Sequence, residues 1–302
     1  MLWLTRSFPV QALNAVVFGF VFAQFGLLGH DAAHNQIFRT PRANTLFGRV
    51  CGNLLLGMDL EWWRGHHNAH HVRPNQEGYD PDADIPILAF TPEQAERRRG
   101  LFRWCSRYQS FLMPLLPGWQ VFDLNLRSAT FLIQRRPRRV SVGSALFAAH
   151  FVLYAGVLIP SQGVFHGLLF ALIQRVISGF YLSSVFATNH TGMPVLSVGQ
   201  KMDFLEQQVI TSRNIRPRRG LAFLFGGLHL QIEHHLFPSM ARNQLRHAQP
   251  IVRAFCEEHG LPYRETPFLA TYGEIFRHMW GISRAMPKLP HERAAQPLPA
   301  AS

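Results

Sequence analysis

The sequence predicts an all-α integral membrane protein, in which about three transmembrane helices carry a cytosolic helical cap with a histidine-ligated metal site. Three observations support this prediction. Charged residues make up only 16% of the 302 residues, below the ~25% usual for soluble domains. Several apolar segments are long enough to cross a bilayer. Histidines recur three and four residues apart, which is the spacing of one helix face.

The apolar segments lie at about residues 10–29, 141–160 and 164–188. A spanning helix needs ~20 residues, so each segment is long enough. The first runs directly into His30 without a small-residue cleavage site, which favours a retained helix over a signal peptide. A buried core helix is the alternative. Arg175 lies inside the third segment, and we expect it either to face the bundle interior or to accompany a kink.

Basic residues predict the orientation. Of the 30 Lys and Arg residues, 15 lie between His30 and Arg139 and 13 follow His190, whereas the link at 160–163 carries none. The positive-inside rule then places both long regions in the cytoplasm, with Arg135–Arg139 as the strongest anchor. We therefore expect a multi-pass protein with its histidine clusters on the cytoplasmic face.

Residues 44–58 and 108–134 are expected to be amphipathic helices, either along the membrane interface or packed in the cap. Residues 74–86 are expected to form a loop. We predict one domain over residues 1–286 and a disordered tail over 287–302, which is rich in Pro and Ala.

The net charge of +12 raises the question of nucleic acid. Basic residues do not alternate with aromatic residues as in single-strand binders, so nucleic acid is not expected as a partner. Three distant cysteines, Cys51, Cys105 and Cys256, encode neither a disulfide framework nor a thiolate metal site.

Eight histidines are the candidate metal ligands. They form three clusters and one single residue: His30 and His34; His67, His70 and His71; His234 and His235; and His190. Imidazole suits Fe, Zn, Cu and Ni. Adjacent histidines on a helix diverge by ~100°, which favours two metal ions over one. Iron is preferred for oxygen chemistry beside lipid, whereas a structural zinc site would usually include thiolates.

Two carboxylates lie inside these clusters. Asp31 and Glu233 are expected to accept the second ring N–H of a ligand histidine, which fixes its tautomer and orientation.

The three clusters and their surroundings resemble those of membrane fatty-acid desaturases. The boxes read His-Asp-x-x-His, His-x-x-His-His and Gln-x-x-His-His. The chain is most similar to the front-end acyl-lipid and linoleoyl-CoA-type branch, whose third box begins with Gln. The resemblance covers about residues 20–268 and includes Glu61–Arg64, Asp80–Asp84, Gln208–Asn214 and Gln231–Met240.

This resemblance implies a non-haem di-iron enzyme that uses O2 and two external electrons to introduce a double bond into an acyl-CoA or acyl-lipid. The family's ligands correspond to the eight histidines above, with His190 as the extra ligand after the last span. Asn189 and Gln231 stand beside them, Gln231 where other branches have a histidine. His66 and His229 fall outside the ligand positions.

The resemblance also implies partners. The His-Pro-Gly-Gly haem motif of many front-end members is absent from the sequence, so a separate ferredoxin or cytochrome with its reductase is expected to supply electrons. Family members have two spans before the first box, whereas this chain has room for one. We expect the family's first transmembrane helix to be missing.

Other residues carry less specific expectations. Candidate walls of an acyl tunnel, or alternatively core residues, are Trp62, Trp63, Phe180, Phe204 and Leu205. Candidate contacts for a phosphate head group, an acidic electron donor or anionic lipid are Arg213, Arg216, Arg218 and Arg219. His150 lies outside the boxes, so its replacement should not affect metal binding.

Two alternatives stay open. A hydroxylase of the same superfamily uses the same centre, and a non-enzymatic membrane protein could bind zinc or sense pH through its 16 histidines.

Overall fold

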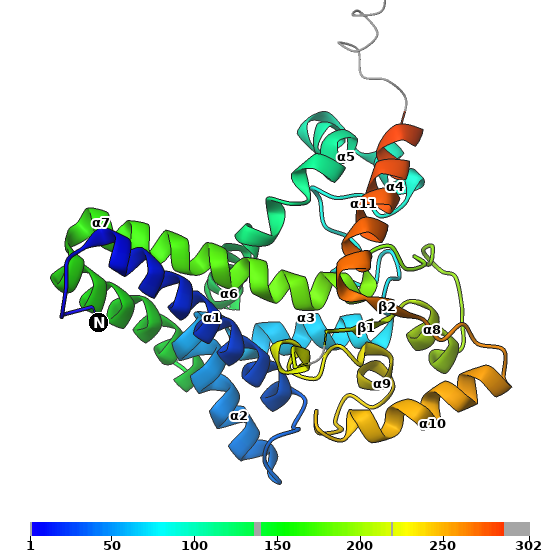
Figure 1. Cartoon of the computed structure of the whole chain (residues 1–302), viewed down its shortest axis with the longest axis horizontal. Coiled ribbons are helices and arrows are strands. Elements are labelled where there is room, and N and C mark those ends of the chain that lie inside the picture. Colours follow the sequence, from blue (N-terminus) through cyan, green and yellow to red (C-terminus); the bar gives the residue numbers. More distant parts are fainter. Residues whose placement is uncertain (1, 136–139, 219, 287–302) are drawn as a thin grey trace, which may run out of the picture.

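The computed structural model describes residues 2–135, 140–218 and 220–286. These residues form mostly helices and one small parallel sheet, so the predicted helical class is confirmed (Figure 1). The helices are α1 (Phe8–Ala33), α2 (Pro41–Arg49), η1 (Val50–Leu56), α3 (Leu60–Val72), α4 (Pro92–Arg97), α5 (Gly100–Leu112), η2 (Leu116–Trp119), α6 (Gln120–Arg135), α7 (Val142–His190), α8 (Phe204–Ile210), η3 (Ala222–Phe225), α9 (Gln231–Leu236), α10 (Leu245–Glu258) and α11 (Phe268–Ala285). The strands are β1 (Asn214–Arg216) and β2 (Glu265–Pro267). The predicted tail and most of the basic anchor, Arg136–Arg139, lie outside the described residues.

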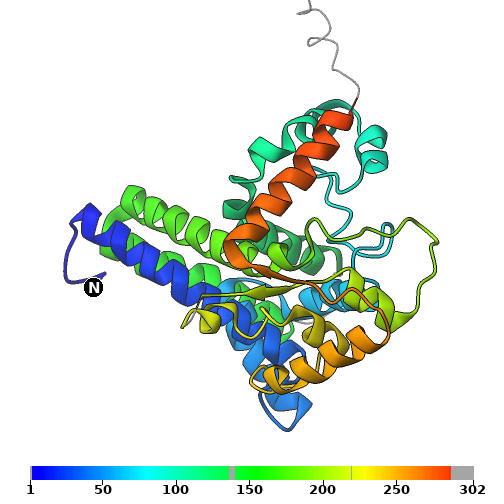
Figure 2. The same ribbon diagram turned by 45° about the vertical axis from the view of Figure 1, so that its right-hand side comes forward.

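Within the described residues, two helices, α1 and α7, are long and apolar enough to cross a membrane. The second and third apolar segments both lie within α7, whose 49 residues comprise two helices joined at a kink. The predicted spans at about 141–160 and 164–188 therefore correspond to the two arms of α7, one on each side of Gly163. Gly163, with φ 76° and ψ 168°, reverses its direction. The two arms of α7 then return side by side, as the approach of Gly167 to Leu158 and both views show (Figures 1 and 2).

Small residues let α1 lie close to the returning arm of α7. A Cβ on Gly19 would stand 2.7 Å from Ile177, and the hydroxyl of Ser178 donates to the Gly19 carbonyl at 2.8 Å. Arg175 faces the bundle interior as expected. Its guanidinium lies 3.2 Å from Nε2 of His150 and over the ring of Tyr154.

The expected amphipathic segments are helical but interrupted. Residues 44–58 fall on α2 and the π-helix η1, which ends at Gly57 with φ 72°. Residues 108–134 are divided between α5, η2 and α6. Residues 74–86 form turns without a helix, as predicted.

The turn at Gly57 positions α3, which carries the second histidine cluster. Asn125 on α6 donates to the carbonyls of Leu56 and Gly57, at 3.2 and 2.7 Å. Asp59 then caps α3 by accepting from the backbone N–H groups of Glu61 and Trp62. A Cβ on Gly57 would meet His150 at 2.7 Å, so this close turn requires glycine.

Candidate metal centre

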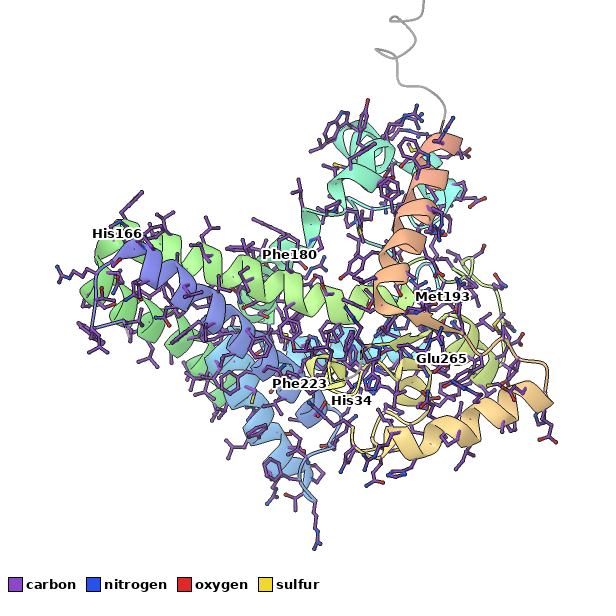
Figure 3. The ribbon with its side chains drawn as sticks, in the orientation of Figure 1. His34, His166, Phe180, Met193, Phe223 and Glu265 are labelled. Atoms are coloured by element: carbon purple, nitrogen blue, oxygen red, sulfur yellow. The ribbon has the colours of Figure 1, made fainter. Side chains whose placement is uncertain are left out.

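All eight candidate histidines meet where the ends of α1 and α7 approach α3 and α9. The larger of two sets, called the first group, contains His30, His34, His67, His71 and His234. One nitrogen from each lies within 4.8 Å of those of the others. Spacing of four residues on α1 and on α3 aligns the members of each pair. His34, at the end of α1, is labelled in Figure 3.

The second group contains His70, His190 and His235, whose nitrogens also lie within 4.8 Å of one another. Adjacent histidines in the sequence thus belong to different groups, as helical divergence predicts. The rings of His71 and His235 stack at 4.3 Å between centroids, so the two groups share a boundary.

Several nitrogens of the first group are buried without a hydrogen-bond partner. These are Nε2 of His30, His34 and His234 and Nδ1 of His71. In addition, Nε2 of His67 lies 3.0 Å from Nε2 of His71. Buried unpaired nitrogens cost free energy, and a metal ion would satisfy them. This donor set therefore fits a metal bound by neutral imidazoles.

Burial also keeps these imidazoles neutral. Removal from water lowers the pKa of His34 to about 2, with a smaller effect from neighbouring His30. Desolvation likewise lowers the pKa of His67, His71 and His234 well below the ordinary value. Because metal ligation requires the unprotonated ring, the shift favours binding.

Each histidine of the second group has a hydrogen-bond partner at Nδ1. Asp80 accepts from His70 at 2.9 Å, the Gln208 amide oxygen from His235 at 2.8 Å, and the Thr211 carbonyl from His190 at 3.0 Å. These contacts assign the proton to Nδ1, so the unprotonated Nε2 of each ring is the atom that could bind a metal. The charge and hydrogen bond of Asp80 raise the pKa of His70, although burial alone would lower it.

Gln231 lies beside the second group. Its Nε2 lies 3.0 Å from Nε2 of His190, and its Oε1 accepts from Nδ2 of Asn189 at 2.9 Å. Asn189 also donates to the carbonyl of Leu228 at 3.0 Å, which ties the end of α7 to the approach of α9. The structure thus places Asn189 and Gln231 beside the histidines.

The two carboxylates inside the clusters behave differently. Asp31 lies 3.4 Å from Nδ1 of His30 and pairs with Arg242, so its expected contact is present. For Glu233 the expectation is wrong, because its carboxylate accepts from Asn214 at 2.8 Å and Tyr263 at 2.7 Å. Successive helical residues point ~100° apart, which turns Glu233 toward β1 rather than the histidines.

Sequence reasoning did not assign roles to Asp80, Gln208 and Thr211. All three are buried and lie in motifs that the resemblance covers. The signal that the sequence offered for Asp80 was a carboxylate ten residues after His70 in a predicted loop. His66 and His229 lie outside both groups, as expected, and His66 pairs with Asp82 at 2.8 Å.

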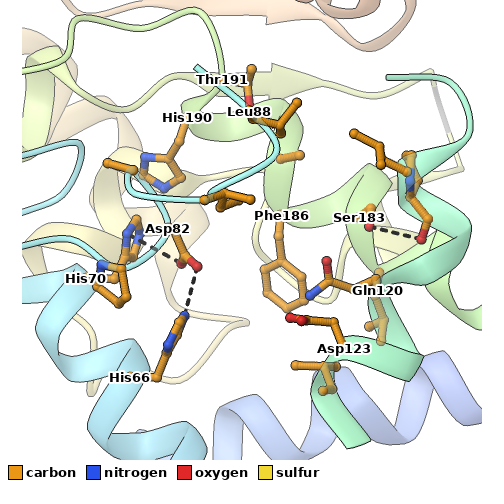
Figure 4. A pocket seen from close by; sticks show the side chains of 18 of the residues that line it. His66, His70, Asp82, Leu88, Gln120, Asp123, Ser183, Phe186, His190 and Thr191 are labelled. Carbon is orange, nitrogen blue, oxygen red and sulfur yellow. Dashed lines mark hydrogen bonds and ion pairs between the residues drawn. The ribbon is translucent and has the colours of Figure 1, made fainter. Parts of the chain in front are cut away.

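An apolar cavity of about 530 Å³ begins at the histidines (Figure 4). His67, His70, His190 and Gln231 are part of its lining. Its walls are mainly apolar and aromatic residues of α3, α6, α7 and the segment 85–90, and they include Trp62, Trp63, Leu88, Leu124, Leu182 and Phe186.

The expected walls are thus partly correct. Trp62 and Trp63 line the cavity, whereas Phe180, Phe204 and Leu205 lie outside its lining. Phe180 packs over Gly118, Leu205 packs beside Val209, and Phe204 is exposed.

The expectation that Arg213 holds a head group is also wrong. Arg213 is fully buried, pairs with Glu274 at 2.6 Å and donates to the carbonyls of Thr188 and Thr191. It therefore fixes the end of α7 on both sides of His190. Arg216 and Arg218 are exposed, and Arg219 lies outside the described residues.

The sequence was compared with known proteins. The family model for fatty acid desaturase matches residues 7–267. The acyl-lipid (9-3)-desaturase of Physcomitrium patens is 33% identical, and the match covers 93% of this chain and 55% of the relative. The delta(5) fatty acid desaturase fat-4 of Caenorhabditis elegans is 30% identical over 91% of this chain and 65% of the relative. The delta(8)-fatty-acid desaturase of Euglena gracilis is 31% identical, with 87% and 65% covered. The chain thus spans between about half and two thirds of the length of these curated relatives.

Proposed function

Since this chain belongs to the fatty acid desaturase family, we propose that it is an O2-dependent desaturase that introduces a cis double bond into a long-chain acyl-CoA or acyl-lipid. One hydrogen leaves each of two adjacent carbons. Together with two external electrons and two protons, these hydrogens reduce O2 to two molecules of water.

The observation that carries this proposal is that histidines of both groups, His67 of the first and His70 and His190 of the second, line one mainly apolar cavity. Breaking an alkyl C–H bond exceeds the reactivity of amino-acid side chains, so two iron ions, which the eight histidines would hold, would supply the oxidising chemistry. The second group borders the cavity through His70 and His190, opposite Asp123 and Gln120 in Figure 4.

The chain's own residues position the substrate and exclude water. Trp62, Trp63 and Phe186 bound the cavity near the histidines, so an acyl chain lying between them presents a limited set of carbons. Fixing one carbon pair in this way converts an unreactive chain into an oriented reactant and decides the regiochemistry.

The cellular setting forms part of the proposal. We place α1 and both arms of α7 across the membrane and the histidine groups on its cytoplasmic face. A separate ferredoxin, or a cytochrome with its reductase, supplies the electrons. The desaturase domain comprises residues 1–286.

The test is the fatty-acid profile of cells that express the intact chain or its His67→Ala variant, with double-bond positions located by mass spectrometry. We expect a new unsaturated acid only with the intact chain, because His67 belongs to the first group and also lines the cavity. His259→Ala is the matched control, because His259 is exposed and distant from both groups.

The alternatives give different products. A hydroxylated acid in place of the alkene would establish a hydroxylase. Bound zinc, with no O2 consumption when reduced ferredoxin is supplied, would establish a non-enzymatic metal-binding protein. Normal desaturation by His67→Ala would contradict the ligand assignment.

A further inference from the structure

Helix α5 places polar side chains toward the protein and apolar side chains outward, which is the reverse of a helix on a water-exposed surface. Its protein-facing side carries the buried polar residues Ser106, Gln109 and Ser110. Gln109 bonds through its amide to both backbone groups of Ala89, at 2.9 and 3.0 Å. Its outer side is apolar, with Leu101, Trp104 and Phe111 exposed at 70%, 43% and 59%. An outward apolar face of this kind requires a non-aqueous partner.

Helix α11 extends this apolar face. Phe276 and Trp280 are exposed and lie four residues apart, so they share one side of the helix. The ring of Phe111 lies 6.4 Å from that of Phe276 and 5.5 Å from that of Trp280. Exposed apolar residues of α5 and α11, with Leu115 in the turn after α5, form a surface here called the apolar stripe: Leu101, Trp104, Phe111, Leu115, Phe276 and Trp280.

The apolar stripe is continuous with the exposed flank of α7. The connecting helix η2 lies directly against α7, since a Cβ on Gly179 would stand 2.7 Å from the Pro117 carbonyl. Exposed Leu115 and Trp119 stand at the two ends of η2, and exposed Phe180 lies beside it on α7. In both ribbon views α11 rises across the direction of α1 and α7, as a helix parallel to the membrane plane must (Figures 1 and 2).

Arginines flank the apolar stripe. Residues 92–112 contain five Arg and two Glu, so this segment is basic. On α11, Arg277 and Arg284 are exposed, and the guanidinium of Arg284 lies 5.7 Å from the ring centre of Trp280. Aromatic and leucine side chains beside arginines are typical of helices that lie in the interface of an anionic bilayer.

We propose that the apolar stripe is a membrane-docking surface, which inserts into the interface of an anionic phospholipid bilayer beside the spanning helices. This inference rests on the proposed placement of α1 and α7 across the membrane. Arginines that flank the stripe contact lipid phosphates, while its rings lie at the boundary between head groups and acyl chains. A second copy of the chain is disfavoured by the like charge of the rim.

Docking also determines where the cavity opens. Phe102 on α5 and Trp119 on η2 both line the cavity and are themselves exposed. Their position next to the apolar stripe places this side of the cavity at the level of the lipid head groups.

The test uses the full chain in nanodiscs that contain phosphatidylcholine and phosphatidylglycerol. Single cysteines at Leu101→Cys and Phe111→Cys, in a Cys105→Ser background, carry a fluorescent label; Cys51 and Cys256 are buried. Two reference sites are Leu168→Cys on α7 and Glu258→Cys on α10, both at exposed positions. Quenching is measured with nitroxide-labelled lipid and with aqueous iodide.

We expect the nitroxide lipid to quench labels at Leu101 and Phe111 as strongly as it quenches the label at Leu168. Iodide should quench these two labels much less than it quenches the label at Glu258. Iodide quenching at both stripe sites, with lipid quenching at Leu168, would overturn the docking surface alone. Quenching by neither agent would also overturn it and would indicate a protein partner. Absence of lipid quenching at Leu168 would overturn the membrane placement and the inference with it.

The charge requirement is tested by Arg277→Gln combined with Arg284→Gln. We expect lipid quenching at Phe111 to fall while that at Leu168 is unchanged. Equal quenching at Phe111 in variant and parent would overturn the contribution of these arginines.

Discussion

The two histidine groups are built differently. The first group has five imidazoles, four of them in i, i+4 pairs on α1 and α3. The second has three imidazoles from three separate elements, each oriented by a non-histidine partner at Nδ1. Helix geometry alone therefore aligns most of the first group, whereas the second depends on hydrogen bonds from surrounding segments. The two groups should therefore respond differently when a ligand is removed, when a hydrogen-bond partner is replaced or when the pH is lowered.

The largest expected difference comes from removing one ligand of each group. His70→Ala leaves two imidazoles in the second group, too few to retain a metal ion, whereas His34→Ala leaves four in the first. We expect His70→Ala to lower the metal content by about one ion per chain and activity by ~100-fold or more. His34→Ala should retain its metal. Metal analysis of the purified variants measures this, and equal losses would show that the groups are not independent.

A smaller effect is expected from the partner of His70. Asp80→Asn removes the carboxylate that accepts from Nδ1 and should lower activity by about 10- to 100-fold. Asp84→Asn is the matched control, because Asp84 is exposed and accepts from the backbone N–H of Gly78 rather than from a histidine. Initial rates with saturating substrate and electron donor measure the effect. Similar rates for Asp80→Asn and the parent would refute the orienting role.

The pH dependence of the metal-free chain should reflect mainly the first group. The pKa values of His34, His67, His71 and His234 are lowered by burial, so the unfolded chain binds protons that the folded chain does not. Stability therefore falls as the pH drops through the ordinary histidine pKa of about 6.5.

His70 acts in the opposite direction, because its pKa is raised and its contribution is present at low pH. We expect the Tm of the metal-free chain to fall by about 5 °C or more between about pH 7.5 and pH 5. Thermal unfolding in detergent measures it. Replacing His34 by Gln should reduce the fall, and an unchanged slope would contradict the assignment to the first group.

The smallest expected effect comes from adding an imidazole to the second group. In Gln231→His, the new ring takes the place of an amide 3.0 Å from Nε2 of His190. A fourth imidazole should slow the release of metal to a chelator by several-fold without increasing the number of ions bound. Faster release than in the parent would mean that the amide, bonded to Asn189, is the better support.

The sequence predicts the site better than the surroundings that support it. Helical spacing alone separates His70 from His71 and His234 from His235, because neighbours on a helix diverge. Asp80 and Gln208 could not be assigned, since their contacts depend on how the segment 74–86 and helix α8 pack against α3 and α9. Glu233 and Arg213 were misassigned for a similar reason: each is satisfied by residues distant in the sequence, Tyr263 and Glu274.

The fold shows the same limit. Hydropathy identifies the apolar segments and the link at 160–163 between two of them, but it does not predict that helical structure continues through this link up to a kink at Gly163. The contacts of His150, which the sequence does not predict, matter for the choice of a control variant. Its ring accepts a contact from Arg175 and donates to the Leu54 carbonyl at 2.9 Å, so replacing it disturbs packing behind η1 and makes it a poor neutral control.

The most direct test of the central claim is the metal content of the purified chain, combined with Mössbauer spectroscopy after growth on ⁵⁷Fe. Two histidine groups, each binding one ion, predict about two iron ions per chain with distinct ligand environments. About one iron per chain, or zinc in place of iron, would contradict the account.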